Sequence, residues 1–250
     1  KEEFFETMRY FKNRMALAGV NIHLNQRVEA QTLIDSDFDE VILATGIKPR
    51  TPAIEGVEHE KVMTYLDVLK HKKPVGKKVA VIGAGGIGFD VSEYLVEKHS
   101  LTMEPEKWLK NWGIDKNFTN PGALIPCEVE APEREVYLLQ RKASKVGKNL
   151  GKTTGWIHRA ALKQKRVQMI NNVSYDKIDD AGLHISIGDD KKVLDVDNII
   201  ICAGQEPLRE LQSAIESAGK AVHLIGGADV AAELDAKRAI KQGAELAAAI

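Results

Sequence analysis

One glycine-rich segment limits what this chain can fold into more than any other feature. Residues 83–88 carry the spacing GxGxxG, directly after a Val- and Ile-rich run at 78–82 and before a helix-like run at 89–98. In this setting the first glycine permits a tight turn, the second lets the backbone approach a pyrophosphate, and the third allows close helix–strand packing. The N-terminus of the helix would then face the phosphates. We therefore predict a dinucleotide-binding loop with Gly83, Gly85, Gly86 and Gly88 as binding residues.

The rest of the chain alternates strand-like and helix-like runs. Such alternation is typical of an α/β fold with a largely parallel sheet, here a Rossmann-like one. Residues 99–134 contain Pro105, Pro121, Pro126 and Pro132, and we expect them to be irregular. Helices are expected at 4–18, 64–71, 89–98, 155–164 and 231–250, and strands at 20–24, 41–44, 78–82, 135–140, 167–170, 183–187, 197–201 and 222–226.

An internal similarity indicates a duplicated fold. Residues 38–46 match residues 196–204 as an acidic turn, a buried strand and an exit that ends in Gly46 or Gly204. Pro49 and Pro207 follow at the same offset. No glycine-rich loop precedes Gly46, so the first copy is expected to lack its beginning. The chain is accordingly expected to be a piece of something longer.

The end of the strand at 135–140 bears on which dinucleotide is bound. An acid at a strand end binds the ribose of NAD, whereas Arg accommodates the 2′-phosphate of NADP. This strand is followed by Arg141, Lys142, Ser144 and Lys145, with no acid among them. The pattern favours NADPH, and the alternative is a solvated basic loop. Glu104 or Glu106 would be the ribose acid of an NAD site by spacing, but both fall in the Pro-rich segment rather than at a strand end.

Composition and charge exclude several classes of function. With 35 Lys+Arg against 36 Asp+Glu, the net charge of -1 gives no reason to expect a nucleic-acid partner. No apolar run approaches the ~18 residues of a membrane span, and the acidic first residues do not resemble a signal peptide. Cys127 and Cys202 form no CxxC pair and are too few for a four-Cys metal or iron–sulfur site. A reducing, cytoplasmic location is the default expectation.

Two further patterns are assigned structural roles on sequence alone. Asp67 and His71 have the i,i+4 spacing of a metal pair, but without a third ligand a surface pair is the favoured interpretation, and no metal is expected. Asp229 precedes the last helix and is favoured as its N-cap.

Five stretches of the chain together resemble one known family. The chain resembles the C-terminal half of the bacterial NADPH-dependent 2,4-dienoyl-CoA reductases, which are related to trimethylamine dehydrogenase. That resemblance implies that NADPH reduces an FAD bound here, for reduction of 2,4-dienoyl-CoA in fatty acid β-oxidation. It also implies a partner N-terminal barrel that carries FMN, a 4Fe-4S cluster and the substrate acid. The stretches are 44–52, 74–89, 138–159, 196–207 and 223–239.

The resemblance also implies a domain layout and cofactor residues. Residues 1–50 would be a partial FAD-binding domain and 208–250 its return segment, 51–76 would be a linker, and 77–207 would be an inserted NADPH-binding domain. The NADPH residues would be the four glycines of 83–88 with Arg141, Lys142 and Lys145, to which we add Ser144 and Gly204. The FAD residues would be Gly46, Gly227 and Asp229.

Two other functions remain open from the sequence. The chain would alternatively be a stand-alone NAD(P)-dependent dehydrogenase, or a non-catalytic nucleotide-binding module. The first would need an acid or base near the nicotinamide, and no side chain in the sequence is assigned a catalytic role.

Overall fold

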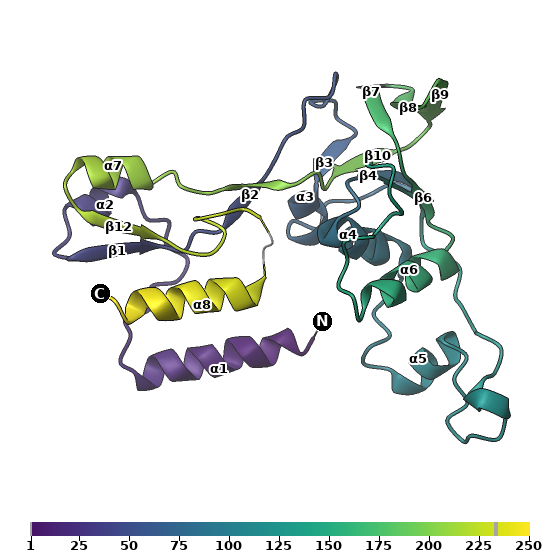
Figure 1. Cartoon of the computed structure of the whole chain (residues 1–250), viewed down its shortest axis with the longest axis horizontal. Helices are drawn as coiled ribbons and strands as arrows, with labels where there is room; N and C mark the ends of the chain where they lie inside the picture. The colour runs from purple at the N-terminus through teal and green to yellow at the C-terminus, as the bar shows by residue number, and fades with distance from the viewer. Residues whose placement is uncertain (1, 233–234) are drawn as a thin grey trace. The chain divides into compact units, whose positions relative to one another are not determined.

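The computed structural model describes residues 2–232 and 235–250 and divides into two compact units. Unit 1 is made of Lys1–Gly46 and Pro207–Ile250, and unit 2 is Ile47–Glu206. Figure 1 shows the elements of both units along the chain. Each unit has its own core, and the predicted binding loop lies in unit 2.

Unit 2 is built around a five-stranded parallel sheet with the order β3-β10-β4-β5-β6. Its strands are β3 (Val62–Thr64), β4 (Lys78–Ile82), β5 (Glu135–Leu139), β6 (Gln168–Ile170) and β10 (Asn198–Ile201). In the register, Ile82 lies opposite Ile201 on one side and Leu139 on the other. All carboxyl ends therefore meet at one edge, where an open α/β sheet binds its ligands.

The central strands β4 and β10 are buried on both faces, which explains their continuous apolar sequence. Val79 and Val81 pack on the face covered by α4 (Gly86–Val96), together with Phe89, whereas Ala80 and Ile82 pack on the other face. That second face is covered by an antiparallel sheet of β7 (Ser174–Asp179), β8 (Gly182–Ile187) and β9 (Asp190–Leu194). Unit 2 also contains α3 (Tyr65–Leu69), α5 (Pro105–Asn111), η1 (Pro121–Ala123) and α6 (Gly155–Gln164).

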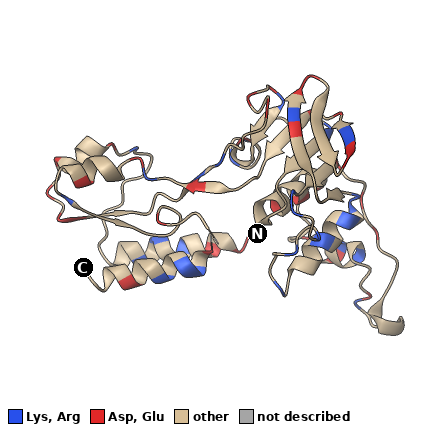
Figure 2. Cartoon of the chain, turned by 45° about the horizontal axis from the view of Figure 1, so that its top comes forward, with Lys and Arg blue, Asp and Glu red and all other residues tan. Residues whose placement is uncertain are grey.

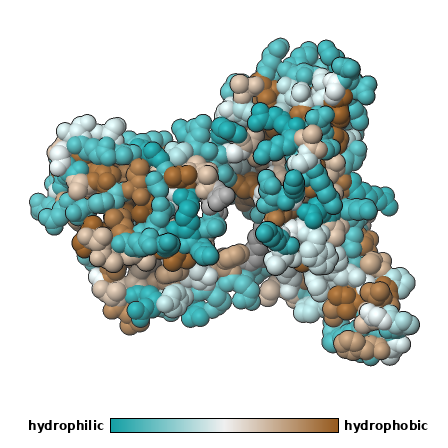
Figure 3. All heavy atoms as spheres, viewed as in Figure 1, coloured by the Kyte–Doolittle hydropathy of each residue, from teal (hydrophilic) through white to brown (hydrophobic). Residues whose placement is uncertain are grey.

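The described residues of unit 1 form a parallel pair of strands and four helices. β1 (Glu40–Leu43) pairs with β12 (Ala221–Leu224), and the helices are α1 (Phe4–Leu17), α2 (Ala30–Ile34), α7 (Gln212–Ser217) and α8 (Ala236–Ala247). The core is small, formed by Val41, Leu43 and Ile215 with half-buried neighbours. Apolar side chains of α1 remain exposed, and Figure 3 shows brown, apolar residues on the visible face of this unit. In the described part of the chain, no helix has the length and apolarity needed to cross a bilayer.

The α/β, Rossmann-like fold is confirmed, and the strand at 78–82 and the helix at 155–164 match their predicted bounds. Two predictions are wrong. Residues 20–24 form no strand, and 99–134 contain α5, which begins at Pro105 because proline fits the first helical turn. α8 begins at Ala236 rather than near 231, and residues 233–234 lie outside the described part.

The duplicated exits have a structural counterpart. After Gly46 comes β2 (Ile47–Pro49), and after Gly204 comes β11 (Gln205–Pro207). These two short strands pair with each other. Gly46 and Gly204 both have positive φ, 78° and 102°, so each exit turns in a conformation that favours glycine.

The acidic turn before β10 fixes the start of β4. Asp197 Oδ2 accepts hydrogen bonds from the backbone N–H groups of Lys77 at 2.7 Å and Lys78 at 2.8 Å. Asp195 contributes only an exposed ion pair with Lys78 Nζ at 2.8 Å.

We expect Asp197→Ala to lower the free energy of unfolding by about 1–3 kcal/mol, because it removes the acceptor of two backbone donors. Asp195→Ala is the matched control and should lower the free energy of unfolding much less, since exposed ion pairs contribute little. Urea titration of both variants measures the difference. Equal losses would show that the two backbone bonds add nothing.

Asp67, the candidate metal residue, closes a capping box at the start of α3. Its Oδ2 accepts from Thr64 N at 2.9 Å, and Asp67 N donates to Thr64 Oγ1 at 3.2 Å. Lys73 Nζ lies 2.6 Å from Asp67 Oδ1. Hydrogen bonding to Lys73, with help from Thr64, lowers the pKa of Asp67 to about 2.

Because the folded pKa of Asp67 lies below its unfolded value, its contribution to stability is present above about pH 4 and lost as pH falls toward 2. We expect Asp67→Asn to have a flatter dependence of unfolding free energy on pH in that window. Urea titrations from neutral to acidic pH measure this. Identical slopes for both proteins would contradict the assignment.

Candidate dinucleotide-binding site

Two glycines of the 83–88 loop are required by close backbone packing. Gly83 has a φ of 109°, and a Cβ on it would lie 2.4 Å from the carbonyl oxygen of Cys202 at the end of β10. Gly83 N donates to Leu139 O at 3.0 Å. A Cβ on Gly88 would lie 1.8 Å from Gly83 O. These contacts seat the loop between β10 and β5 and draw α4 onto β4.

The other two glycines face open space. A Cβ on Gly85 or Gly86 would meet no heavy atom within 4 Å. Gly85 is the N-cap of α4, and no side chain caps that helix. The first N–H groups of α4 therefore have room for an anionic ligand, which is the arrangement that binds a pyrophosphate. The loop fits a dinucleotide.

The segment after β5, which we call the basic loop (residues 141–145), is held in place by neutral amides. Gln140 Nε2 donates to Ser144 O at 2.6 Å and to Lys142 O at 2.9 Å. Asn171 Nδ2, after β6, donates to Ala143 O at 2.6 Å. These anchors use the loop's carbonyls and leave its charged side chains unconstrained.

The cations of the basic loop have no partners within the described residues. Arg141, Lys142 and Lys145 are exposed and form no side-chain hydrogen bond or ion pair there, while Ser144 is half-buried. Burial raises the pKa of the nearby Tyr175 phenol, and the charge of Arg141 offsets only part of this rise. Tyr175 is therefore neutral and does not pair with Arg141 as an anion. The loop is thus a cationic site without an acid at the carboxyl end of β5.

The exit of β10 carries a cation that the sequence did not single out. Arg50 Nε donates to Ala203 O at 3.0 Å, and Arg50 N donates to Gly204 O at 3.1 Å. Beside it, burial raises the pKa of the Cys202 thiol to about 12, so this cysteine is not a thiolate at neutral pH.

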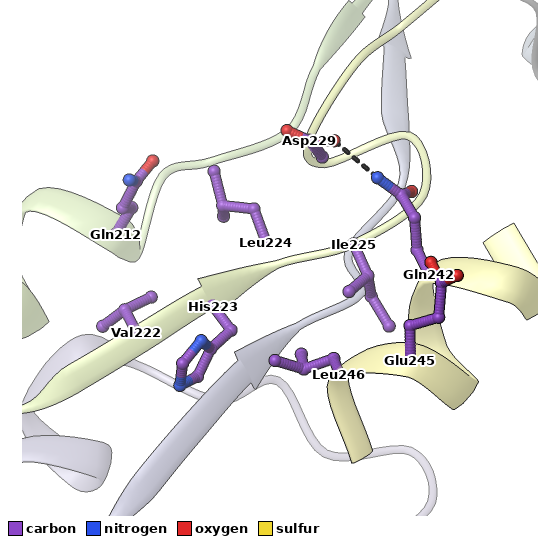
Figure 4. A pocket seen from close by; sticks show the side chains of 9 residues that line it. All are labelled: Gln212, Val222, His223, Leu224, Ile225, Asp229, Gln242, Glu245 and Leu246. Atoms are coloured by element: carbon purple, nitrogen blue, oxygen red, sulfur yellow. Dashed lines mark hydrogen bonds between the residues drawn. The ribbon is translucent and has the colours of Figure 1, made fainter. Parts of the chain in front are cut away.

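The predicted flavin residues lie in unit 1, at the ends of its two strands. Asp229 lines an open pocket of about 450 Å³ beside β12 and α8, where its Oδ2 accepts from Gln242 Nε2 at 2.7 Å (Figure 4). Gly227 lies in the same turn, and a Cβ on Gly46 would meet nothing within 4 Å. The predicted capping role of Asp229 is wrong, because Asp235 caps α8 by accepting from Arg238 N at 2.6 Å.

The weaker candidates do not assemble into a site. Glu104 and Glu106 pair with Lys107 and Lys116 around α5, away from any strand end. Among the described residues, no three His, Cys, Asp or Glu side chains are grouped to hold a metal ion. Lys and Arg are interspersed with Asp and Glu over the visible elements (Figure 2).

A parallel sheet with this loop at its carboxyl edge defines a nucleotide-binding domain of the Rossmann-like, FAD/NAD(P)-binding class. Residues 6–238 match the pyridine nucleotide-disulphide oxidoreductase family, and the chain belongs to that family. The family implies binding of FAD and NAD(P) and an oxidoreductase function.

Its curated relatives include two reductases. The chain is 23% identical to the metal reductase of Desulforamulus reducens over 232 residues, covering 91% of this chain and 34% of that protein. It is also 23% identical to the bilirubin reductase of Mediterraneibacter gnavus over 243 residues, covering 97% and 32%. The chain thus spans about a third of the length of these relatives.

Solved structures with the same fold are also longer proteins. A 2-naphthoyl-CoA reductase in complex with 2-naphthoyl-CoA has a TM-score of 0.75 at 23% identity, with 97% of this chain and 31% of that chain covered. Histamine dehydrogenase from Rhizobium sp. has a TM-score of 0.60 at 16% identity, covering 91% and 33%. At these identities the likeness concerns the fold.

The two kinds of glycine predict opposite effects of one added methyl group. Gly85→Ala should fold with a loss of no more than about 1 kcal/mol, yet weaken NADPH and NADH alike, because its Cβ enters the space for the pyrophosphate. Gly88→Ala should instead destabilise the fold strongly, because its Cβ meets backbone at 1.8 Å. Thermal unfolding and calorimetric titration separate these outcomes. Normal nucleotide affinity in Gly85→Ala would make the loop a mere turn.

Proposed function

We propose that this chain is the electron-input part of a larger flavin-dependent oxidoreductase, and that NADPH is the nucleotide bound by unit 2. The observation that carries the proposal is the basic loop. Its three cations have no partners in the described part of the chain, and no acid accompanies them where an NAD site would have one. Unpaired cations at that position match a 2′-phosphate.

Each residue of the site has a stated task toward NADPH. Gly85, Gly86 and the first turn of α4 would bind the pyrophosphate through backbone N–H groups. Arg141 presents a planar fork suited to bidentate phosphate binding, whereas Lys142 and Lys145 act as point charges. Ser144 adds a hydroxyl. When bound, NADPH supplies the hydride and the flavin accepts it, so the chain's own residues bind and orient rather than donate protons.

Unit 1 fits only one end of a flavin nucleotide. Gly46, Gly227 and Asp229 would contact it at the ends of β1 and β12. The sequence of unit 1 contains no GxGxxG loop, so the binding site for the other end is proposed to lie in the parent protein. We assign FMN and the 4Fe-4S cluster to the parent's N-terminal barrel.

The proposed substrate of the parent enzyme is 2,4-dienoyl-CoA, in fatty acid β-oxidation. Support comes from the five stretches that resemble the dienoyl-CoA reductases. Further support comes from the fold shared with a 2-naphthoyl-CoA reductase, whose substrate is also a CoA thioester conjugated to carbon–carbon double bonds. The substrate would be reduced outside this chain, which spans about a third of such proteins.

Selectivity for the 2′-phosphate tests the proposal directly. Arg141→Ala should raise the dissociation constant of NADPH by about tenfold to hundredfold, since a charge-assisted bidentate contact is lost. The affinity for NADH, which lacks that phosphate, should change little. Calorimetric titration of both nucleotides measures the ratio.

Arg166→Ala is the matched control, because Arg166 is an exposed arginine at the opposite, amino-terminal edge of the sheet, before β6. It should alter neither affinity. Equal weakening of NADPH and NADH by Arg141→Ala would overturn the 2′-phosphate assignment. Failure of the unaltered chain to bind either nucleotide would overturn the proposed function as a whole.

A further inference from the structure

Arg50 is exposed, yet both its side chain and its backbone form hydrogen bonds at the exit of β10. Its Nε and Nη2 both donate to Ala203 O, and its backbone N donates to Gly204 O. Gly204 has a φ of 102°, and a Cβ there would lie 2.9 Å from Arg50 Nη2. The absence of a side chain at Gly204 therefore leaves room for the guanidinium, which is positioned by its two hydrogen bonds to Ala203 O.

The charge of this guanidinium is not neutralised by the protein. Arg50 forms no ion pair with any carboxylate in the described ranges 2–232 and 235–250. Glu206 lies on the neighbouring β11, and its Oε2 is 3.8 Å from Lys48 Nζ rather than paired with Arg50. Nε and Nη2 each use one N–H group on the same acceptor, Ala203 O. The remaining N–H donors of the guanidinium are therefore available to a ligand.

Its place along the sheet edge indicates which ligand. β10 adjoins β4, Cys202 N donates to Ile82 O at 2.8 Å, and a Cβ on Gly83 would lie 3.2 Å from Ala203 Cα. Arg50 thus lies one strand from the 83–88 loop, on the side opposite β5 and the basic loop. A dinucleotide with its 2′-phosphate at β5 and its pyrophosphate at the loop extends its nicotinamide half toward β10.

We propose that Arg50 is a second anion-binding residue of this site, which donates to the pyrophosphate from its nicotinamide side and so binds NADPH and NADH alike. This inference rests on the proposed function, because it takes a dinucleotide as the ligand of unit 2. The two cationic groups then divide the work. The basic loop distinguishes the two nucleotides, and Arg50 strengthens the binding of both.

The test compares whole dinucleotides with a fragment that lacks the nicotinamide half. Arg50→Gln in the full chain should raise the dissociation constants of NADPH and NADH by the same factor, about tenfold, because one charge-assisted contact is removed from each. Adenosine 2′,5′-bisphosphate should bind unchanged, since it has no second pyrophosphate phosphorus and no nicotinamide. Calorimetry measures all three ligands.

Two further variants make the result decisive. Arg166→Gln removes the same charge from the far edge of the sheet and should change no affinity. Arg50→Lys keeps the charge but loses the planar guanidinium, and should give an intermediate loss of affinity for both dinucleotides. If thermal unfolding shows that Arg50→Gln is not folded, Arg50→Lys takes its place in the test.

Several outcomes would overturn the inference. One is unchanged dinucleotide affinity in Arg50→Gln while the unaltered chain binds both. Another is equal weakening of the bisphosphate, which would indicate a general disturbance of the site. A third is loss of co-purified flavin with normal NADPH affinity, which would assign Arg50 to the flavin. If Arg50→Gln behaves as expected but Arg141→Ala does not favour NADH, only the 2′-phosphate assignment fails.

Discussion

The site depends on the packing of three backbone segments at the carboxyl edge of the unit 2 sheet. Gly83 lies against the carbonyl of Cys202, and Gly88 lies against the carbonyl of Gly83, both closer than any side chain would permit. This packing brings the start of α4 close to the end of β4, and no side chain caps the N-terminus of α4. The open positions at Gly85 and Gly86, and hence the space for phosphates, follow from it. Glycine is required at 83 and 88 by the fold, whereas at 85 and 86 the open space allows a ligand.

The sequence predicts best those elements whose surroundings are uniform. β4 and β10 are buried on both faces by α4 and by the β7–β8–β9 sheet, so their apolar runs are continuous and their limits are clear. β9 was not predicted, because four of its five residues are exposed and two are lysines, with only Leu194 buried. Residues 20–24 have the opposite character, since their apolar side chains suggest a strand but lie exposed and unpaired. Local composition cannot reveal which segments find a partner.

The same limit applies to the site. The glycines of 83–88 form one short segment of the sequence and the cations of 141–145 form another, so the spacing within each segment predicted a binding role. The groups that position them are not adjacent. Asn171, which donates to the basic loop, follows the next strand, β6. Arg50, which donates to Ala203 O, precedes every strand of the unit 2 sheet in the chain. The sequence repeat singled out Gly204 as a glycine that follows a strand, but only the fold shows that its lack of a side chain leaves room for the guanidinium of Arg50.

The order of the strands is the reason why the proposed binding mode assigns affinity and selectivity to different residues. Because β4 lies between β10 and β5, a cation after β5 and a cation beside β10 are on opposite sides of the 83–88 loop. In the proposed binding mode, a 2′-phosphate on the adenosine ribose would reach only one of them, whereas the pyrophosphate would lie at the loop itself. Substitutions in the basic loop would then change which nucleotide is preferred while leaving the common contacts intact. Arg50 cannot be exchanged so freely, because its guanidinium also donates to the backbone carbonyl of Ala203 and so connects the exit of β10 to the segment after β2.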